Sequence, residues 1–339
     1  MRRALVTGAS GLLGSHVVER FAAEGWAVRA LVRDVDAARW LEPLGASLAR
    51  GDITDEQSVH EAAAGCDVVV HAAAHVAPGT DWTPFYEGNV RGTAYVVGAA
   101  AAAGSRLVVV GSTAVFDDYT KDNYRPVDED VPLPDLPADD LYGRSKKEAE
   151  RAALRAHETG AVWAAVVRPP VMYGARDRQF IPRIAPLLDR GWFFSIDGGQ
   201  AAFPVVHAGA VADGAVRCAL TDAAGGRVYH LTNDFDVSVA DFIRLAAEGL
   251  SRRIRTVDFS ARAARRVFAA LGAVLRMAGR GDLADHVPGA VAMFTAGNPF
   301  SSERARRELG WRPTVTPDVA VPEAFRWWKT HHGKANATT

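Results

Sequence analysis

The sequence is poor in cysteine, has no long apolar run and carries almost no net charge. Its only two cysteines, Cys66 and Cys218, lack the spacing of a metal site or a redox pair, so we expect two buried small residues and no metal. No apolar stretch approaches the length of a membrane-spanning helix, which predicts no integral membrane segment. A formal net charge of −1 gives no electrostatic reason to expect a nucleic acid partner.

The chain also lacks a signal-peptide pattern, because its first apolar segment already forms a predicted strand. We therefore expect a cytoplasmic protein. Apolar residues make up 48% of the 339 residues and charged residues 23%, which is typical of globular domains. This length suits one large domain or two small ones.

Strand and helix patterns alternate from the start of the chain. Helix patterns such as Gly92–Ala103 and Ser145–Thr159 separate short runs of mainly apolar character, which fits strands buried on both faces. These runs are Ala4–Thr7, Ala27–Val32, Ser47–Arg50, Val68–His71, Leu107–Gly111 and Val162–Arg168. The alternation predicts an α/β fold, a Rossmann doubly wound parallel sheet with helices on both faces.

A glycine-rich turn lies between the first strand and the first helix pattern, with the spacing Gly-x-x-Gly-x-x-Gly. Small residues allow the backbone to approach a ligand closely, and the free N–H groups of a helix N-terminus face an anion. We therefore expect a dinucleotide pyrophosphate to bind at this turn, which comprises Gly8, Ser10, Gly11, Leu12, Leu13 and Gly14.

Further motifs follow in the order of a known family. They are Gly51–Asp55, His71–Ala74, Asn89–Thr93, Ser112, Tyr142–Lys146 and Arg168–Gly174. With the glycine turn, they make the chain similar to the extended short-chain dehydrogenase/reductase family of NAD(P)-dependent epimerases, dehydratases and hydroxysteroid dehydrogenases. The resemblance covers the first half of the chain, with weaker matches as far as Trp311. It implies a nicotinamide cofactor and a small-molecule substrate, with a homodimer as one option for assembly.

The resemblance also implies a division of the chain. Residues 1–174 would form the dinucleotide-binding Rossmann domain, with a strand–helix segment near 205–222 that returns to the sheet. Residues 175–333 would mainly form a smaller C-terminal α/β domain that binds substrate, and the polar residues 334–339 a disordered tail. The stretch 117–140 is rich in Asp and Pro and leads directly to Tyr142, which is typical of a functional loop.

Tyr142 and Lys146 are four positions apart on a predicted helix, so both project from one face. A phenol, with a pKa of about 10, is a poor base at neutral pH, but a neighbouring ammonium and an oxidised nicotinamide favour the phenolate. The pair therefore suits protonation of an alkoxide during reduction and deprotonation of a hydroxyl during oxidation.

Ser112 follows an apolar strand, at the sheet edge where ligands bind in open α/β folds. Its hydroxyl can hold the substrate oxygen beside Tyr142. The adjacent Thr113 is chemically equivalent, and the resemblance favours Ser112 as the catalytic residue.

Arg33 ends the second predicted strand, where an acidic residue binds the ribose of NAD and an arginine accommodates the 2′-phosphate of NADP. We therefore expect a preference for NADP. NAD stays a second option, because Asp34 follows immediately.

The resemblance assigns other residues to the cofactor. Asp52 and Ile53 would bind the adenine, although Asp52 could instead cap the helix that begins near Glu56. The backbone of the small residues Ala72, Ala73 and Ala74 would run close to the pyrophosphate and ribose. The turn at Pro169 and Val171 would contact the nicotinamide carboxamide. Asn89 occupies a position with either a structural or a proton-relay role.

The substrate half separates the reaction types that share this cofactor machinery. Sugar 4,6-dehydratases carry an Asp-Glu pair directly after the Ser/Thr, whereas this chain has Thr113 and Ala114, which excludes that subclass. Segments 168–180 and 298–311 resemble the bacterial 3β-hydroxysteroid dehydrogenase/ketoreductase branch. We therefore predict an NADP-preferring ketoreductase or alcohol dehydrogenase for a hydrophobic or polycyclic carbonyl compound, contacted by Ser112, Thr113, Tyr142 and Tyr173.

Two alternatives stay open. The first is a nucleotide-sugar epimerase, which convergence of Arg176, Arg178 and Arg183 on one anion site would favour. The second is a dinucleotide-sensing regulatory protein, against which the Tyr142/Lys146 pair argues. The amphipathic helix predicted over 261–279 is expected to pack on its own domain, with a lid over a lipophilic substrate and a membrane contact as alternatives.

Overall fold

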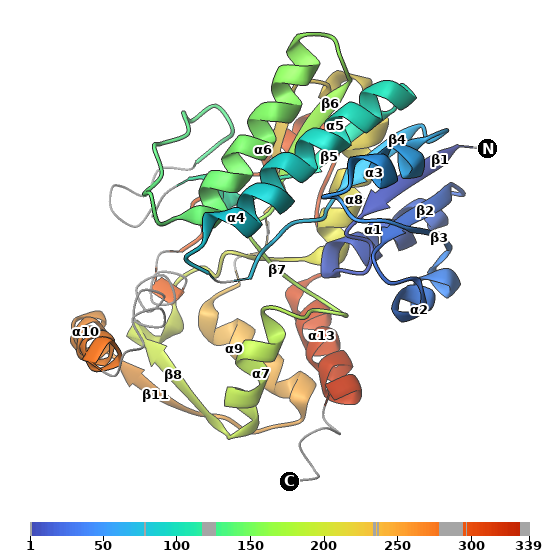
Figure 1. Cartoon of the computed structure of the whole chain (residues 1–339). Helices are drawn as coiled ribbons and strands as arrows, with labels where there is room; N and C mark the ends of the chain where they lie inside the picture. The colour runs from blue at the N-terminus through green and yellow to red at the C-terminus, as the bar shows by residue number, and fades with distance from the viewer. Residues whose placement is uncertain are drawn as a thin grey trace.

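The computed structural model has a main sheet of seven parallel strands in the order β10-β6-β5-β4-β1-β2-β3 (Figure 1). The strands are β1 (Arg3–Thr7), β2 (Ala27–Val32), β3 (Ala46–Arg50), β4 (Val68–His71), β5 (Arg106–Val110), β6 (Ala164–Arg168) and β10 (Val228–His230). The predicted doubly wound parallel sheet is therefore confirmed. The strand order reverses between β1 and β4, and ligands bind at such switch points, outside the carboxyl ends of the strands.

The structure describes residues 2–77, 79–116, 127–232, 235, 237–277, 294–295 and 297–332. From residue 265 onward, some side chains of the predicted helix over 261–279 are also not described. The predicted tail at 334–339 and part of the predicted loop at 117–140 lie outside the described residues.

Helices cover both faces of the main sheet (Figure 1). One layer contains α3 (Glu56–Ala63), α5 (Gly92–Ala103) and α6 (Leu141–Glu158), and the other contains α1 (Leu12–Ala23) and α8 (Ala208–Leu220). Alternate strand residues face the two layers: Leu5 and Val69 belong to the core under α3 and α5, whereas Val6 and Val70 belong to the core under α1 and α8. Short helices α2 (Val35–Ala38) and α4 (Trp82–Phe85) lie in connections.

A second core lies below the carboxyl edge of the sheet (Figure 1). It is built by α7 (Ile181–Asp189), α9 (Val239–Leu250) and α13 (Pro317–His332). Helix α12 (Glu303–Leu309) instead packs on α8. Two small parallel sheets complete this half: β7 (Val171–Tyr173) pairs with β9 (Val205–His207), and β8 (Trp192–Ile196) pairs with β11 (Arg255–Phe259).

The segment 205–222 returns to the main sheet through its helix and not, as predicted, through its strand as well. Helix α8 packs on β5, β6 and α1, whereas its strand, β9, pairs with β7 outside the main sheet. The strand that extends the main sheet beyond β6 is β10. Both strands are only three residues long, so apolar periodicity does not distinguish their partners.

Helix α10 (Ala261–Met277) packs on its own domain in part. Ala264 is 2% exposed, whereas two residues of the predicted apolar face, Val267 and Val274, are 52% and 54% exposed. The side chains of Phe268, Leu271 and Leu275 lie outside the described residues.

No helix among the described residues is long and apolar enough to cross a membrane. Nor do the described residues contain a group of three or more His, Cys, Asp or Glu side chains that could hold a metal ion. Cys66 and Cys218 are both buried and free, as predicted.

Candidate active site

The glycine turn after β1 is closely packed. A Cβ atom on Gly14 would lie 2.2 Å from the carbonyl oxygen of Gly8, and one on Gly8 would lie 2.6 Å from the backbone nitrogen of Ala73. Gly8 also has a φ of +64°, which a side chain rarely tolerates. The two glycines therefore bring the start of α1 and the segment after β4 together.

The N-terminus of α1 can receive an anion. Gly11 is its N-cap residue and provides no side-chain cap, and the first turn contains no acidic residue. The N–H groups of Leu12 and Leu13 therefore have no helical acceptor. The space left by the glycines, next to these N–H groups, fits the pyrophosphate of a dinucleotide. When bound, the nicotinamide of that dinucleotide would supply hydride chemistry.

A buried chain of hydrogen bonds runs from this turn toward α6. Thr7 Oγ1 lies 2.7 Å from His71 Nδ1, and His71 Nε2 lies 3.0 Å from Thr93 Oγ1. Thr93 Oγ1 donates to the carbonyl oxygen of Asn89 at 2.5 Å, so we place the imidazole proton on Nε2. Burial, followed by the charge of Lys146, lowers the pKa of His71 to about 3, which keeps the ring neutral.

Asn89 uses its whole amide to join two segments. Its Oδ1 accepts from the backbone nitrogen of His75 at 2.6 Å, and its Nδ2 donates to the carbonyl oxygen of His75 and to Ser145 Oγ. Ser145 lies on α6 between Tyr142 and Lys146. Asn89 therefore positions the catalytic helix against the segment after β4, which supports the structural role among the two predicted for it.

Ser112 and Tyr142 lie together at the carboxyl edge of the sheet, as their predicted roles require. The Ser112 hydroxyl lies beside the Tyr142 phenol, whose pKa it lowers, and accepts from the backbone nitrogen of Ala114 at 3.1 Å. Thr113 is instead 8% exposed, and its backbone nitrogen donates to the carbonyl oxygen of Pro169 at 3.1 Å. The geometry thus favours Ser112 over Thr113 as the partner of the phenol.

Lys146 is 5% exposed, and its Nζ donates to the carbonyl oxygen of Val110. Burial lowers the pKa of Lys146 to about 8, against the opposing effect of the Glu150 charge. The pKa of Tyr142 is raised, chiefly by burial, although the neighbouring Ser112 hydroxyl opposes this. The expectation that an ammonium and an oxidised nicotinamide together favour the phenolate concerns the protein with cofactor bound and stays a prediction.

Glu150 was missed by the sequence reasoning, although it follows Lys146 by four positions as Lys146 follows Tyr142. Its Oε2 lies 2.9 Å from Nε and 2.8 Å from an Nη of Arg168 at the end of β6. Both side chains are buried. The ion pair joins α6 to the strand that leads into Pro169 and Val171, the predicted nicotinamide contacts.

The residues predicted to bind the adenosine half lie along one edge. Arg33 is exposed after β2, and Asp34 accepts from the backbone nitrogen of Ala37 as the N-cap of α2. The Asp34 carboxylate thus caps a helix, and the assignment of Arg33 to the 2′ position stays a prediction.

Asp52 and Ile53 follow β3. Asp52 accepts from both the backbone nitrogen and the hydroxyl of Thr54 at 2.9 Å, and the cap of α3 is Asp55, so the capping role considered for Asp52 is wrong. Ile53 is half-buried and packs against Gly92 at the start of α5.

The remaining predicted residues lie in the segment after β4 and in β7. Ala72, Ala73 and Ala74 are half-buried beside Gly8, and Val171 pairs with Val205. Tyr173 is only 2% exposed, and its ring packs between those of His207 and Phe242. This burial does not fit the predicted substrate contact.

Three arginines do not converge on one site. Arg176 forms an ion pair with Glu19 at 2.6 Å and donates to Ser15 Oγ at 2.9 Å. Arg178 and Arg183 are exposed. Among the described residues, this segment thus offers no cluster of arginines for a diphosphate.

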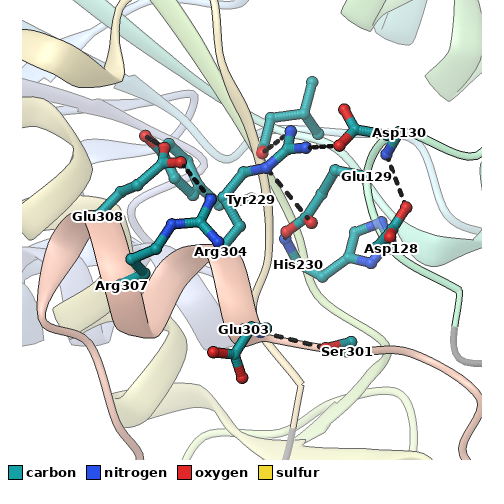
Figure 2. Close-up of polar contacts among 11 residues, drawn as sticks. Asp128, Glu129, Asp130, Tyr229, His230, Ser301, Glu303, Arg304, Arg307 and Glu308 are labelled. Carbon is teal, nitrogen blue, oxygen red and sulfur yellow. Dashed lines mark hydrogen bonds and ion pairs between the residues drawn. The ribbon is translucent and has the colours of Figure 1, made fainter.

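Figure 2 shows how the segment before Tyr142 is fixed to the sheet. Glu129 accepts from the backbone nitrogen of His230 at 2.7 Å, and Arg304 of α12 lies between Glu129 and Asp130. Glu129 is 1% exposed on its side chain. These contacts hold the end of the loop that leads to the catalytic helix.

The comparison with known proteins agrees with this geometry. A model described as the NAD dependent epimerase/dehydratase family matches residues 4–232. The 4-hydroxy-2-methyl-3-oxo-4-farnesyl-3,4-dihydroquinoline-1-oxide ketoreductase of Stigmatella aurantiaca is 34% identical over 321 residues, 93% of each chain. The decarboxylating sterol-4-alpha-carboxylate 3-dehydrogenase of Bos taurus is 26% identical and covers 98% of this chain and 93% of its own.

Solved structures show the same fold. The crystal structure of gox2253 has a TM-score of 0.76 at 24% identity and covers 98% of this chain and 99% of its own. The UDP-glucuronic acid 4-epimerase from Bacillus cereus, in complex with NAD, has a TM-score of 0.73 at 18% identity, with 97% and 99% covered. At these identities the likeness concerns the fold alone.

Proposed function

The chain belongs to the NAD-dependent epimerase/dehydratase family, and we propose that within this family it reduces the ketone of a lipophilic substrate, with NADPH as the preferred donor. The observation that carries the proposal is the position of the Ser112 hydroxyl beside a Tyr142 phenol whose pKa is raised by burial. A protonated phenol beside a hydroxyl is the arrangement that a general acid for a ketone oxygen requires.

Each residue then has one task. Ser112 donates a hydrogen bond to the ketone oxygen and Tyr142 transfers its phenolic proton to that oxygen as the alcohol forms. Lys146, still protonated below a pKa of about 8, places its positive charge beside the developing phenolate. Asn89 and Glu150 hold α6 in position, through Asn89 against the segment after β4 and through Glu150 against the end of β6.

The substrate class is supported by what the site lacks and by what its relatives act on. Arg176, Arg178 and Arg183 do not form an anion site, as a nucleotide diphosphate would need. The named substrates of the relatives are a farnesyl-bearing quinoline oxide and a sterol carboxylate. We therefore propose a large, mainly apolar cyclic ketone.

NADPH preference rests on Arg33. Its guanidinium is exposed after β2, while the neighbouring carboxylate of Asp34 is used as a helix cap. An arginine placed there can pair with a 2′-phosphate.

The test is the oxidation of NADPH and NADH by the purified protein with a panel of ketones: 3-ketosteroids, farnesyl-bearing cyclic ketones, aromatic polyketides and small polar ketones. We expect turnover with the lipophilic members, faster with NADPH, and a loss of about 10²–10⁴-fold in Tyr142→Phe. Tyr229→Phe, which removes a hydroxyl bonded to Glu308 away from the site, is the matched control. Interconversion of UDP-sugars without net cofactor oxidation would contradict the proposal.

A further inference from the structure

The outer face of the small β8–β11 sheet is apolar and exposed. Along β8, Phe193 faces the core, where its ring lies 6.1 Å from that of Phe294, and Ser195 is 3% exposed. The alternate residues Trp192 and Phe194 are 48% and 64% exposed. Two aromatic side chains therefore point outward from one short strand, where a solvated sheet face would ordinarily be polar.

Helix α10 follows β11 directly and carries a second apolar stripe. Val267, Val274 and Met277 are 52%, 54% and 81% exposed. Their spacing of seven and then three positions puts them on one side of the helix. In Figure 1, α10 lies beside the β8–β11 sheet, at the side of the molecule away from β2 and β3.

The same elements concentrate positive charge. Together β11 and α10 contain five arginines and one aspartate, in a chain whose formal net charge is −1. Asp258 already accepts from the backbone nitrogen of Gly198. Arg262 and Arg266 are exposed one turn apart on α10, and the guanidinium of Arg255 lies 5.6 Å from the centre of the Trp192 ring.

We propose that β8, β11 and α10 form a surface that binds the headgroups of an anionic lipid bilayer, from which the enzyme takes its substrate. The second part of this statement rests on the proposed lipophilic substrate. We call this face the lipid-binding surface, and define it by Trp192, Phe194, Arg262, Arg266 and Val267.

The positive charge and the exposed apolar side chains of this surface together favour an anionic bilayer as its partner. A helix with an apolar side and an arginine-rich side lies in the bilayer interface, with arginines at the headgroups and apolar residues a few ångströms deeper. Tryptophan is enriched at the same level. Anionic headgroups complement the arginines, whereas a second copy of this chain would bring the same positive charge to the contact.

The test is flotation of the protein with vesicles of phosphatidylcholine alone or with one third phosphatidylglycerol, without ketone or cofactor. We expect binding to the anionic vesicles, weak binding to the neutral ones, and release in 1 M salt. Arg262→Glu with Arg266→Glu should weaken binding at least about tenfold, and Trp192→Ser with Phe194→Ser should weaken it similarly.

The matched control is Arg151→Glu with Arg155→Glu. It makes the same charge change at the same spacing on exposed positions of α6, and it should leave binding intact. Equal loss in the control, equal binding to neutral vesicles, or no binding at all would overturn the proposal. So would a concentration-dependent dimer in light scattering that the Trp192/Phe194 variant abolishes.

The outcome is separate from that of the proposed reduction. Vesicle binding without any ketone turnover would leave the surface standing and remove the ketoreductase. Ketone turnover without vesicle binding would support the ketoreductase and overturn the lipid-binding surface.

Discussion

Replacement of Lys146 by methionine should remove activity while leaving the protein at least as stable at neutral pH. Lys146 is 5% exposed, and its pKa is lowered from 10.5 to about 8, mainly by burial. Each pKa unit corresponds to about 1.4 kcal/mol, so the buried ammonium costs the folded protein about 3 kcal/mol at pH 7. Loss of the bond to the Val110 carbonyl would cost about 1–3 kcal/mol in the variant.

The two contributions predict a Lys146→Met variant between equal in stability and about 2 kcal/mol more stable at pH 7. The pH dependence gives the sharper result. Between pH 8 and 10.5 the unfolded chain binds a proton at Lys146 that the folded protein has released, so wild-type stability rises with pH relative to the variant. Between pH 7 and pH 10, the free energy of unfolding of the wild type should rise, relative to that of the variant, by most of about 3 kcal/mol.

Urea unfolding of both proteins at several pH values from 7 to 10 measures this difference. The same variant should also lose turnover and bind the cofactor more weakly, because its positive charge is gone. A variant more than about 2 kcal/mol less stable at pH 7, with a difference that does not change with pH, would refute the reasoning about the buried ammonium.

Three further predictions concern the site. Tyr142→Phe should reduce kcat by about 10²–10⁴-fold and leave cofactor affinity almost unchanged, because only the proton donor is lost; stopped-flow turnover and cofactor titration measure both, and retention of a third of the activity would contradict the assignment. Arg33→Asp should shift the ratio of kcat/KM for NADPH over NADH downward by about 10–150-fold; a wild type that already prefers NADH would point to Asp34 instead. Glu150→Gln should move the alkaline loss of activity to lower pH, on the order of one pH unit, because the Glu150 charge raises the pKa of Lys146; an unchanged pH–rate profile would exclude that electrostatic role.

The main sheet could be predicted because its strands are buried on both faces. Runs such as Val68–Val70 and Leu107–Val110 are apolar throughout, and a parallel sheet covered by helices on both faces buries such runs fully. The glycine turn was equally predictable, since its spacing reflects contacts that a Cβ would block. Local periodicity and local sterics thus define this half of the fold.

Other features depend on contacts between distant parts of the chain. Tyr173 ends a strand, where an aromatic side chain can face either the cleft or the core, and here it packs on Phe242. The pair of Glu150 and Arg168 joins α6 to β6, and no spacing within one element reveals it. The raised pKa of Tyr142 likewise depends on burial by distant parts of the chain, which spacing along the sequence does not reveal.

The measurement that tests the central claim most directly is the transfer of deuterium from NADPH labelled at nicotinamide C4. With a lipophilic cyclic ketone, we predict an alcohol product one mass unit heavier at the carbinol carbon, formed in step with cofactor oxidation and absent in Tyr142→Phe. If no ketone acquires the label, while a UDP-sugar is interconverted and the cofactor stays at its starting oxidation state, the ketoreductase account is wrong.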